Sequence, residues 1–577
     1  MSSCVKALII AAGIAFAGAP ALAQIECPPD SLEPDCLKDE AWRAAQWAVQ
    51  TSAAQALSQV SARFASGDDD LARLVAERER TVRQRAAAQE ALYEALALSD
   101  PQSREAGSAS ARERLDRLTA ALETLDSRLD EEFPEYAQLT DPSPLSIAEA
   151  QALLRDDEAM ILFLAGDRGS FVFAIDQQGS DWARVDLTAD DLADAVEALR
   201  RSLDPAFGRG PWNAVAVQST SSGLEPFDRA EAYRLYQALF TPIEDRLEGK
   251  RHVYAVPSGA LSSLPLGVMV TTEPQGDDAD PQALAETDWL AREFAMTVLP
   301  TPSSLGALAR FGDSRAAAPF FGVGDPCIGA RAGANCDRAG AGGPDRGNRG
   351  GQAPASFRGA TSRGVYNADA DAVRALSALP NTRPELVSLA RAFGADPDRD
   401  LLLGARATET ALTSTDVLRD RRVIAFATHG LIADELPGLV EPALVLTPPD
   451  QAAEGDDGLL TASEIAHDLD LDADWVILSA CNTAAPDGAG AESLSGLASA
   501  FFYAGARSLL VSHWVVDDAA ARRLTTGALA AMNEDPASGR SEALRRSMLD
   551  LMEDDQFAHP AMWAPFVLVG QNRPVGG

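Results

Sequence analysis

The feature that most constrains the fold is a series of short segments, apolar almost throughout, that recur downstream of residue 145. They read AMILFLAG, SFVFAID, VYAVPS, FAMTVLP, FFGVG, VIAFATHG, PALVLT, WVILSAC, SLLVSHW and FVLVG, and helical patterns separate most of them. A strand that is apolar on both faces must be covered on both faces, which is typical of parallel sheets flanked by helices. We therefore predict one large α/β domain over residues 146–577, with a mostly parallel sheet covered by helices.

The preceding segment, residues 24–135, has helical periodicity instead. Apolar residues from Trp42 to Phe64 recur on one helix face, and a second stripe covers residues 70–98. After the break SDPQS, a third helix carries leucines at alternating steps of three and four, which is coiled-coil spacing: Leu115, Leu118, Leu122, Leu125 and Leu129. We predict an all-α region with an antiparallel hairpin, either a packing module or a surface that binds a protein partner.

Two features mark the boundaries of the α/β domain. The segment FPEYAQLTDPSP separates it from the helices, and Ser146 with Glu149 predicts a capping box at its first helix. A Gly- and Arg-rich insertion runs from about residue 327 to 363 and has too few apolar side chains to order itself. We expect a disordered surface insertion open to proteolysis, with these arginines: Arg331, Arg338, Arg346, Arg349, Arg358 and Arg363.

The first residues predict the compartment. Residues 1–23 contain one lysine, an apolar run from Ala7 to about Ala17, and the sequence Ala-Leu-Ala at their end, which is typical of a cleaved signal peptide. The run is short for a membrane span, and an uncleaved anchor is the alternative. We expect an exported protein, periplasmic or secreted, with no membrane span after cleavage. The net charge of -37 disfavours nucleic acid as a partner and would suit a basic one.

Export permits disulfides, and the cysteines pair locally. Cys27 with Cys36, and Cys327 with Cys336, would each close a short loop, which leaves Cys481 as the odd thiol of the mature chain. The sequence has no C-x-x-C pair and no histidine at ligand spacing from a cysteine pair, so we predict no metal site.

Two apolar segments end in residues that can perform chemistry together. His429 closes VIAFATHG and Cys481 closes WVILSAC. Reactive groups gather at the carboxyl ends of parallel strands, so neighbouring strands would place an imidazole beside a thiol. Gly430 permits close backbone approach, and the loop and helix after Cys481 would lower the pKa of a nearby thiol. The alternative is a structural core cysteine.

Other enzyme classes lack their sequence signatures. The chain contains no G-x-S-x-G segment, which argues against a serine hydrolase of the α/β type. It contains no Walker A segment either, so nucleotide hydrolysis has no support.

Several ordered segments resemble the CHAT domain, a bacterial branch of the caspase-like cysteine peptidases related to separase. They include VIAFATHG, GLLTASEI, WVILSACNTA, GAESLSGLASAFFYAGARSLLVSHWVVDD and HPAMWAPFVLVG, within residues 146–571. The resemblance implies a caspase-haemoglobinase fold, with His429 as base and Cys481 as nucleophile. It also implies an oxyanion hole from the backbone amides of Gly430 and Cys481. The implied reaction is hydrolysis of a protein or peptide through a thioester, without a cofactor.

The resemblance also suggests a specificity pocket. HWVVDD is similar to a separase segment that lines the pocket for the residue before the cut, so Ser512, Trp514 and Asp518 are its candidates. Asp518 would receive an Arg or Lys side chain. Alternatively, Asp517 and Asp518 cap the following helix. Glu492 matches an acidic position of the family and is expected to order the loop after Cys481.

Departures from the family leave alternatives open. The short helical region could only be a remnant of the TPR arrays that often precede such domains. If the enzyme is Arg-directed, its own Arg-rich insertion is a candidate for self-cleavage. The alternative to a peptidase is a catalytically silent CHAT scaffold that binds a protein partner, although such a scaffold has no need to keep both His429 and Cys481.

Overall fold

The structure is a computed structural model. It describes residues 34–49, 101–132, 144–204, 224–311, 314–329, 370–379, 382–413, 416–431, 441–449, 456–479, 496–514, 516–535 and 537–572, with a few single positions between them. The strands are β1 Glu158–Leu164, β2 Ser170–Asp176, β3 Gly179–Val185, β4 His252–Val256, β5 Ala295–Val298, β6 Ala318–Gly324, β7 Leu401–Leu403, β8 Arg421–Ala427, β9 Gly430–Leu431, β10 Ala443–Val445, β11 Leu459–Thr461, β12 Trp475–Ser479, β13 Ser508–Ser512 and β14 Phe566–Gly570.

The main sheet has 11 strands in the order β3-β2-β1-β4-β5-β14-β13-β12-β8-β6-β7. Neighbouring strands are parallel except at β1/β2, β2/β3 and β13/β14. The central strands are buried on both faces; along β1, for example, Met160 and Leu162 face one core while Ile161 and Phe163 face the other. The predicted mostly parallel sheet is therefore confirmed, with antiparallel pairs at one edge and at β13/β14 in its middle.

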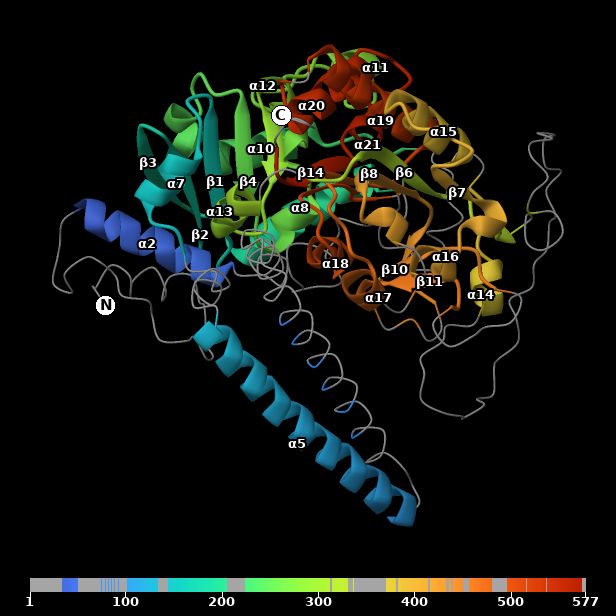
Figure 1. Ribbon diagram of the computed structural model, residues 1–577. Coiled ribbons are helices and arrows are strands. Elements are labelled where there is room, and N and C mark those ends of the chain that lie inside the picture. Colours follow the sequence, from blue (N-terminus) through green and yellow to red (C-terminus); the bar gives the residue numbers. More distant parts are fainter. Residues whose placement is uncertain are drawn as a thin grey trace.

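Helices cover both faces of this sheet, and each layer buries its apolar side in one of two cores (Figure 1). One layer holds α8 Ala189–Leu203, α10 Arg229–Leu239, α11 Pro281–Ala285, α12 Leu290–Glu293, α15 Thr382–Ala392, α19 Asp518–Glu534, α20 Arg540–Met552 and α21 Pro560–Trp563. The other holds α2 Pro34–Ala48, α7 Ile147–Leu153, α13 Pro302–Phe311, α16 Glu409–Thr413, α17 Ala462–Asp468 and α18 Gly496–Ala504. Figure 1 shows α19 and α20 above the sheet and α17 and α18 below it.

The antiparallel pair β13/β14 divides the main sheet into two blocks, and within the first block β2 runs opposite to its neighbours. The first block is β14, β5, β4, β1, β2 and β3, and the second block is β13, β12, β8, β6 and β7. They meet at the antiparallel pair β13/β14. Strand β14 in turn joins β5 through two register pairs, Leu568–Thr297 and Val569–Val298. All five strands of the second block run in one direction, so their carboxyl ends share one edge.

Four strands were not predicted from the sequence, and one predicted strand belongs to a second sheet instead of the main one. β3 is half exposed, and β7, β9 and β11 have only two or three residues. PALVLT does form a strand, β10, but it belongs to a separate antiparallel sheet in the order β11-β10-β9. This small sheet matters for the site because β9 follows directly on the end of β8.

The N-terminal helices are only partly described. Helix α2 packs on the main sheet through Trp42, whose ring centroid lies 6.0 Å from that of Phe173, and the Gln46 side chain hydrogen-bonds the backbone N–H and carbonyl of Leu145. The predicted third helix is α5, Pro101–Glu132. Its proposed hairpin partner lies almost wholly outside the described residues, so the hairpin stays a prediction.

Of the remaining boundary predictions, one is confirmed and the others lie outside the described residues. The Ser146 capping box is confirmed: its Oγ accepts from Glu149 N, and the Glu149 carboxylate accepts from Ser146 N at 2.7 Å. The predicted signal segment and nearly all of the 327–363 insertion lie outside the described residues. In the part of the chain that is described, we find no helix with the length and apolar character needed to cross a bilayer.

Candidate active site

The candidate site lies at the carboxyl edge of the second block, where β8 and β12 end side by side. They are parallel neighbours, and Ala427, the last residue of β8, pairs with Ser479, the last residue of β12. His429 and Cys481 each follow two residues later in the sequence. Adjacent strands are about 4.8 Å apart, so the chain leaves the sheet at two neighbouring points at equal height. Cys481 itself lies outside the described residues.

His429 is held in one orientation by a backbone carbonyl. It is 7% exposed, and its Nε2 lies 2.7 Å from the carbonyl oxygen of Ser377. A carbonyl oxygen can only accept a hydrogen bond, so Nε2 carries the hydrogen. The neutral ring then has its lone pair on Nδ1. The hydrogen bond to the Ser377 carbonyl therefore fixes the tautomer, as a hydrogen bond to one ring nitrogen does for histidines that act through the other nitrogen.

The segment that carries Ser377 rests on a tightly turned glycine. Gly329 has a φ of +58°, which favours glycine over other residues. A Cβ at Gly329 would lie 2.7 Å from the Leu376 carbonyl oxygen and 2.9 Å from Ala378 N, so no side chain fits there. This close approach supports the chain on both sides of Ser377.

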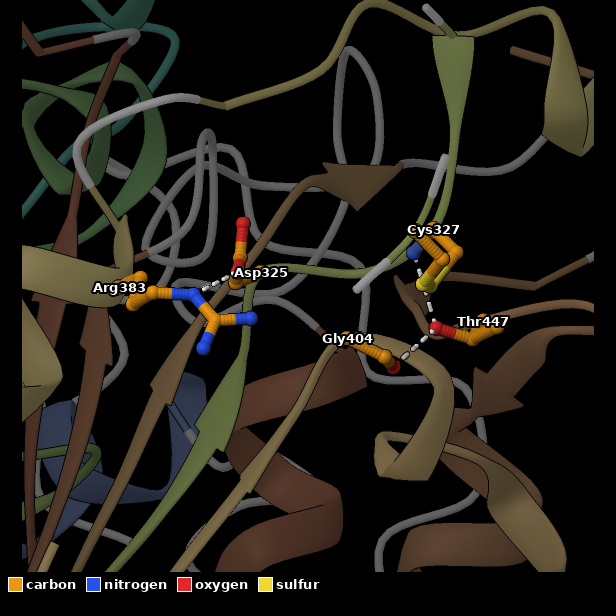
Figure 2. Close-up of a disulfide and its surroundings, with 6 residues drawn as sticks. Asp325, Cys327, Arg383, Gly404 and Thr447 are labelled. Carbon is orange, nitrogen blue, oxygen red and sulfur yellow. Dashed lines mark hydrogen bonds and ion pairs between the residues drawn. A yellow bond between two sulfur atoms is a disulfide. The ribbon is translucent and has the colours of Figure 1, made fainter. Parts of the chain in front are cut away.

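A disulfide anchors the start of the same loop, as Figure 2 shows. Cys327 is bonded to Cys336, with 5.2 Å between their Cα atoms, so this predicted pair is confirmed. The Cys327 N–H donates to Thr447 Oγ1 at 2.9 Å, and that hydroxyl donates to the Gly404 carbonyl at 2.8 Å (Figure 2). The disulfide loop is therefore tied to the chain after β7 and after β10.

The loop after β6 is fixed by an ion pair as well. Asp325 is 1% exposed with a φ of +56°, and its carboxylate accepts from Arg383 Nε at 2.6 Å (Figure 2). The Gly404 N–H donates to the Asp325 carbonyl at 3.2 Å. These contacts hold the ends of β6 and β7 beside the end of β8.

Gly430 begins the small sheet. It lies in β9 and pairs with Leu444 of β10. The Val445 N–H donates to the His429 carbonyl at 2.9 Å, and the Thr428 hydroxyl donates to the Val445 carbonyl. The backbone from Thr428 to Gly430 is thus held against β10, which makes its position rigid.

A buried carboxylate that sequence analysis missed lies at the end of β12, on the side of α15 and α19. Glu385 of α15 is 5% exposed, and its carboxylate accepts from Ser479 Oγ at 3.2 Å and from Thr525 Oγ1 at 3.5 Å. It therefore joins the end of β12 to α15 and α19. The signal was present: Glu385 stands on the same helix face as the buried Leu386 and Leu389.

The candidate pocket residues after β13 are mostly buried. Ser512 ends β13 and is 1% exposed; Trp514 is fully buried, and its Nε1–H donates to the Ala561 carbonyl at 3.0 Å. Asp517 caps α19 by accepting from Ala519 N and Ala520 N, which confirms the capping alternative for this residue. Asp518 is the first residue of α19, and its side chain lies outside the described residues.

The remaining predicted residues are placed only in part. Glu492 and Cys27 lie outside the described residues, whereas Cys36, in α2, is disulfide-bonded. Among the described residues, no group of three or more His, Cys, Asp or Glu side chains has the arrangement of a metal site.

Comparison with solved structures gives distant similarities. The Saccharomyces cerevisiae separase–securin complex matches at 10% identity and a TM-score of 0.40, over 82% of this chain and 34% of that one. The Arg-specific cysteine proteinase gingipain R matches at 10% identity and 0.32, over 73% and 78%. The Porphyromonas gingivalis complex of RgpB pro- and mature domains matches at 9% and 0.32, over 67% and 77%.

These similarities are weak, and the separase match covers only part of the matched chain. This chain spans about a third of the separase chain that it matches. All three TM-scores are below 0.5, so the fold rests on the strand order above. A comparison with curated proteins finds no match.

The family comparison is decisive. The model of the CHAT domain matches residues 229–571, more than half of the chain, from α10 through β14. The matched range contains the ends of β8 and β12, His429 and Cys481. This chain therefore belongs to the CHAT domain family.

Proposed function

We propose that this protein is an exported cysteine endopeptidase in which His429 and Cys481 form the catalytic dyad. The observation that carries the proposal is the register of β8 and β12, in which the two strands end at paired residues, each two positions before one member of the dyad. Family membership supports the reaction class, because CHAT domains resemble caspase-like peptidases.

The proposed chemistry assigns one task to each group. The Cys481 thiolate adds to the substrate carbonyl carbon, and the backbone amides of Gly430 and Cys481 stabilise the oxyanion. The C–N bond then breaks while the His429 imidazolium protonates the leaving amine, which leaves a thioester. His429 next takes a proton from water, the water oxygen adds to the thioester, and the C–S bond breaks to release the acid and restore the thiolate.

The geometry of His429 supports its role as the base. Its Nε2–H is held by the Ser377 carbonyl at 2.7 Å, so Nδ1 is the nitrogen that can exchange a proton with the thiol. A ring held in one tautomer does not have to reorient before each transfer, which lowers the cost of reaching the reactive geometry.

Specificity and context complete the proposal. Asp518 is the candidate acid for an Arg or Lys before the cut, and its neighbour Asp517 is already committed to the α19 cap. Export is supported by the signal-like segment and by the disulfide at Cys327. The N-terminal helices remain a candidate surface for a protein partner.

One experiment tests the dyad and the pocket together. The full chain, Cys481→Ala and Asp518→Ala are incubated with a peptide library varied at the residue before the cut, and the products are read by mass spectrometry. We expect cleavage after Arg or Lys by the intact chain and none by Cys481→Ala. Equal cleavage by both would remove Cys481 as nucleophile, and an unchanged Arg preference in Asp518→Ala would move the pocket elsewhere.

The same incubation reports on self-cleavage. If the enzyme is Arg-directed, the intact chain should be cut within the Arg-rich 327–363 segment while Cys481→Ala stays whole. An intact chain that cleaves peptides but remains uncut would refute self-cleavage without affecting the dyad.

A further inference from the structure

A cavity lies where the two blocks of the sheet meet. It is bounded by β4, β5 and β14, by α20, and by the turns η3 Gly259–Ser263 and η4 Leu266–Val268. The cavity volume is about 70 Å³, and most lining residues are apolar, such as Leu264, Met296 and Leu568. Phe294, Met296 and Met548 are partly exposed, so the cavity has a mouth toward solvent.

Three buried polar side chains line this cavity without hydrogen-bond partners. They are Ser262, His513 and Ser541, which are 5%, 4% and 2% exposed. The atoms left unpaired within the described residues are Ser262 Oγ, His513 Nδ1 and Ser541 Oγ. Buried polar atoms are paired in the great majority of cases, and each unpaired one costs about 1–3 kcal/mol. Three of them around one space indicate a missing occupant.

The charges around the cavity indicate that the occupant is neutral. Arg545 donates to the Ala291 and Arg292 carbonyls and pairs with Glu542, and Arg200 pairs with Asp204, so both cations are already compensated. Burial, with Arg200 nearby, lowers the pKa of His513 to about 3, so its imidazole is neutral at ordinary pH. No lining group described here offers an uncompensated charge to a ligand.

We propose that this cavity is a binding site for a small uncharged amphiphile, with an apolar body and hydroxyl or amide groups. Hydroxyls and a neutral imidazole can each donate or accept, which suits such groups. The volume is about half that of a 150 Å³ cavity that binds benzene, so the ligand has few heavy atoms or inserts the end of a longer chain. His429 does not line this cavity, and the proposal does not depend on the proposed dyad.

Methionine methyl groups allow a test independent of activity. Met296 and Met548 line the cavity, whereas Met160 is fully buried in the opposite core. The full chain is labelled at the methionine methyls and titrated, by NMR, with linear alkanols from propan-1-ol to hexan-1-ol. We expect saturable shifts at Met296 and Met548 but not at Met160, with affinity rising about fourfold per added methylene until the cavity is full.

Charged analogues test the ligand class. Hexanoate and hexylammonium should bind at least about tenfold more weakly than hexan-1-ol, because each would bury an uncompensated charge. Tighter binding of either ion would overturn the neutral class. An absence of saturable shifts with every alkanol would mean that water alone fills the cavity and would overturn the site.

Serine variants identify the polar contacts. Ser262→Ala and Ser541→Ala should each weaken alkanol binding about fivefold, while the free protein keeps or gains stability because an unpaired hydroxyl is removed. Ser508→Ala is the matched control, because Ser508 does not line the cavity and its hydroxyl donates to the Asp474 carbonyl at 2.8 Å. This variant should lose stability but keep its affinity for the alkanols. Unchanged affinity in both cavity variants would refute the assigned contacts.

Discussion

Each block of the main sheet contains a buried histidine near a strand end, but the two are held differently. His252, at the start of β4 in the first block, has Nε2 2.8 Å from Thr297 Oγ1 and Nδ1 3.5 Å from the Glu158 carboxylate. His429, just beyond β8 in the second block, has Nε2 2.7 Å from a backbone carbonyl. The Nε2 of His252 contacts a side-chain hydroxyl inside the sheet, whereas the Nε2 of His429 contacts a backbone carbonyl beyond the strand end.

The comparison teaches where chemistry can be located in this sheet. Burial lowers the pKa of His252, and its neighbours come from β1 and β5, so it acts as a cross-strand contact within the core. His429 lies past the last hydrogen-bonded pair, where a parallel strand opens into a loop. A histidine inside a strand stabilises the sheet, and one just beyond it is able to meet a substrate.

The largest expected effect separates these two histidines. His429→Ala should lower kcat/KM by about 10³-fold or more with little loss of stability, because it removes the proposed base. His252→Ala should do the opposite: it leaves the Thr297 hydroxyl buried without this partner, while Glu158 keeps Arg155, so we expect a loss of about 1–3 kcal/mol in unfolding free energy. Peptide hydrolysis measures kcat/KM, and urea unfolding measures the unfolding free energy of each variant. Comparable activity losses in the two folded variants would contradict the distinction.

The next effect concerns the loop that supports Ser377. Replacing Cys327 and Cys336 together by serine opens a loop with a sequence separation of 9 and should cost about 2–3 kcal/mol of unfolding free energy. Because this loop is linked through Gly329 to Ser377, we also expect kcat to fall several-fold. Denaturant unfolding and steady-state kinetics check this. A loss of stability with kcat unchanged would break the link between the disulfide and His429.

A third prediction uses a buried acid beside the small sheet. Burial, with Glu464 and Asp457 nearby, raises the pKa of Glu409 to about 9 from its ordinary value of 4.5. The folded state therefore retains a proton that the unfolded state loses, and stability falls as pH rises between these values. Glu409→Gln should remove that fall and be more stable than the intact chain by about 1–3 kcal/mol at pH 8. Calorimetry from pH 5 to 9 measures it; parallel pH dependence of both proteins would exclude Glu409 as the cause.

The smallest effect distinguishes two adjacent acids. Asp517→Ala removes the α19 cap and should cost about 1 kcal/mol of stability while leaving the residue preference unchanged. Asp518→Ala should change the preference with less effect on stability. Thermal unfolding and the peptide library compare the two variants. Reversed outcomes would mean that Asp517, and not Asp518, contacts the substrate.

Much of this arrangement could be predicted, because the signals were local. The strands of both blocks appear as apolar segments such as those ending at Ala427 and Ser479, and two of them lead into His429 and Cys481. Ser377 could not be predicted, since it contributes a carbonyl oxygen that every residue has. Strand β3 was missed because its pattern is half polar, and β7 because three residues carry too little periodicity.

The sequence alone determined which residues are the candidates for the chemistry and where most of the strands lie, because side-chain identity and apolar periodicity are local properties of the chain. It also indicated the pairing of Cys327 with Cys336. Only the tertiary structure decided that Ala427 stands opposite Ser479, that a carbonyl holds His429, and that Ser262, His513 and Ser541 surround one cavity. These relations join residues far apart in the chain, and they arise only when strands pair and helices pack over them.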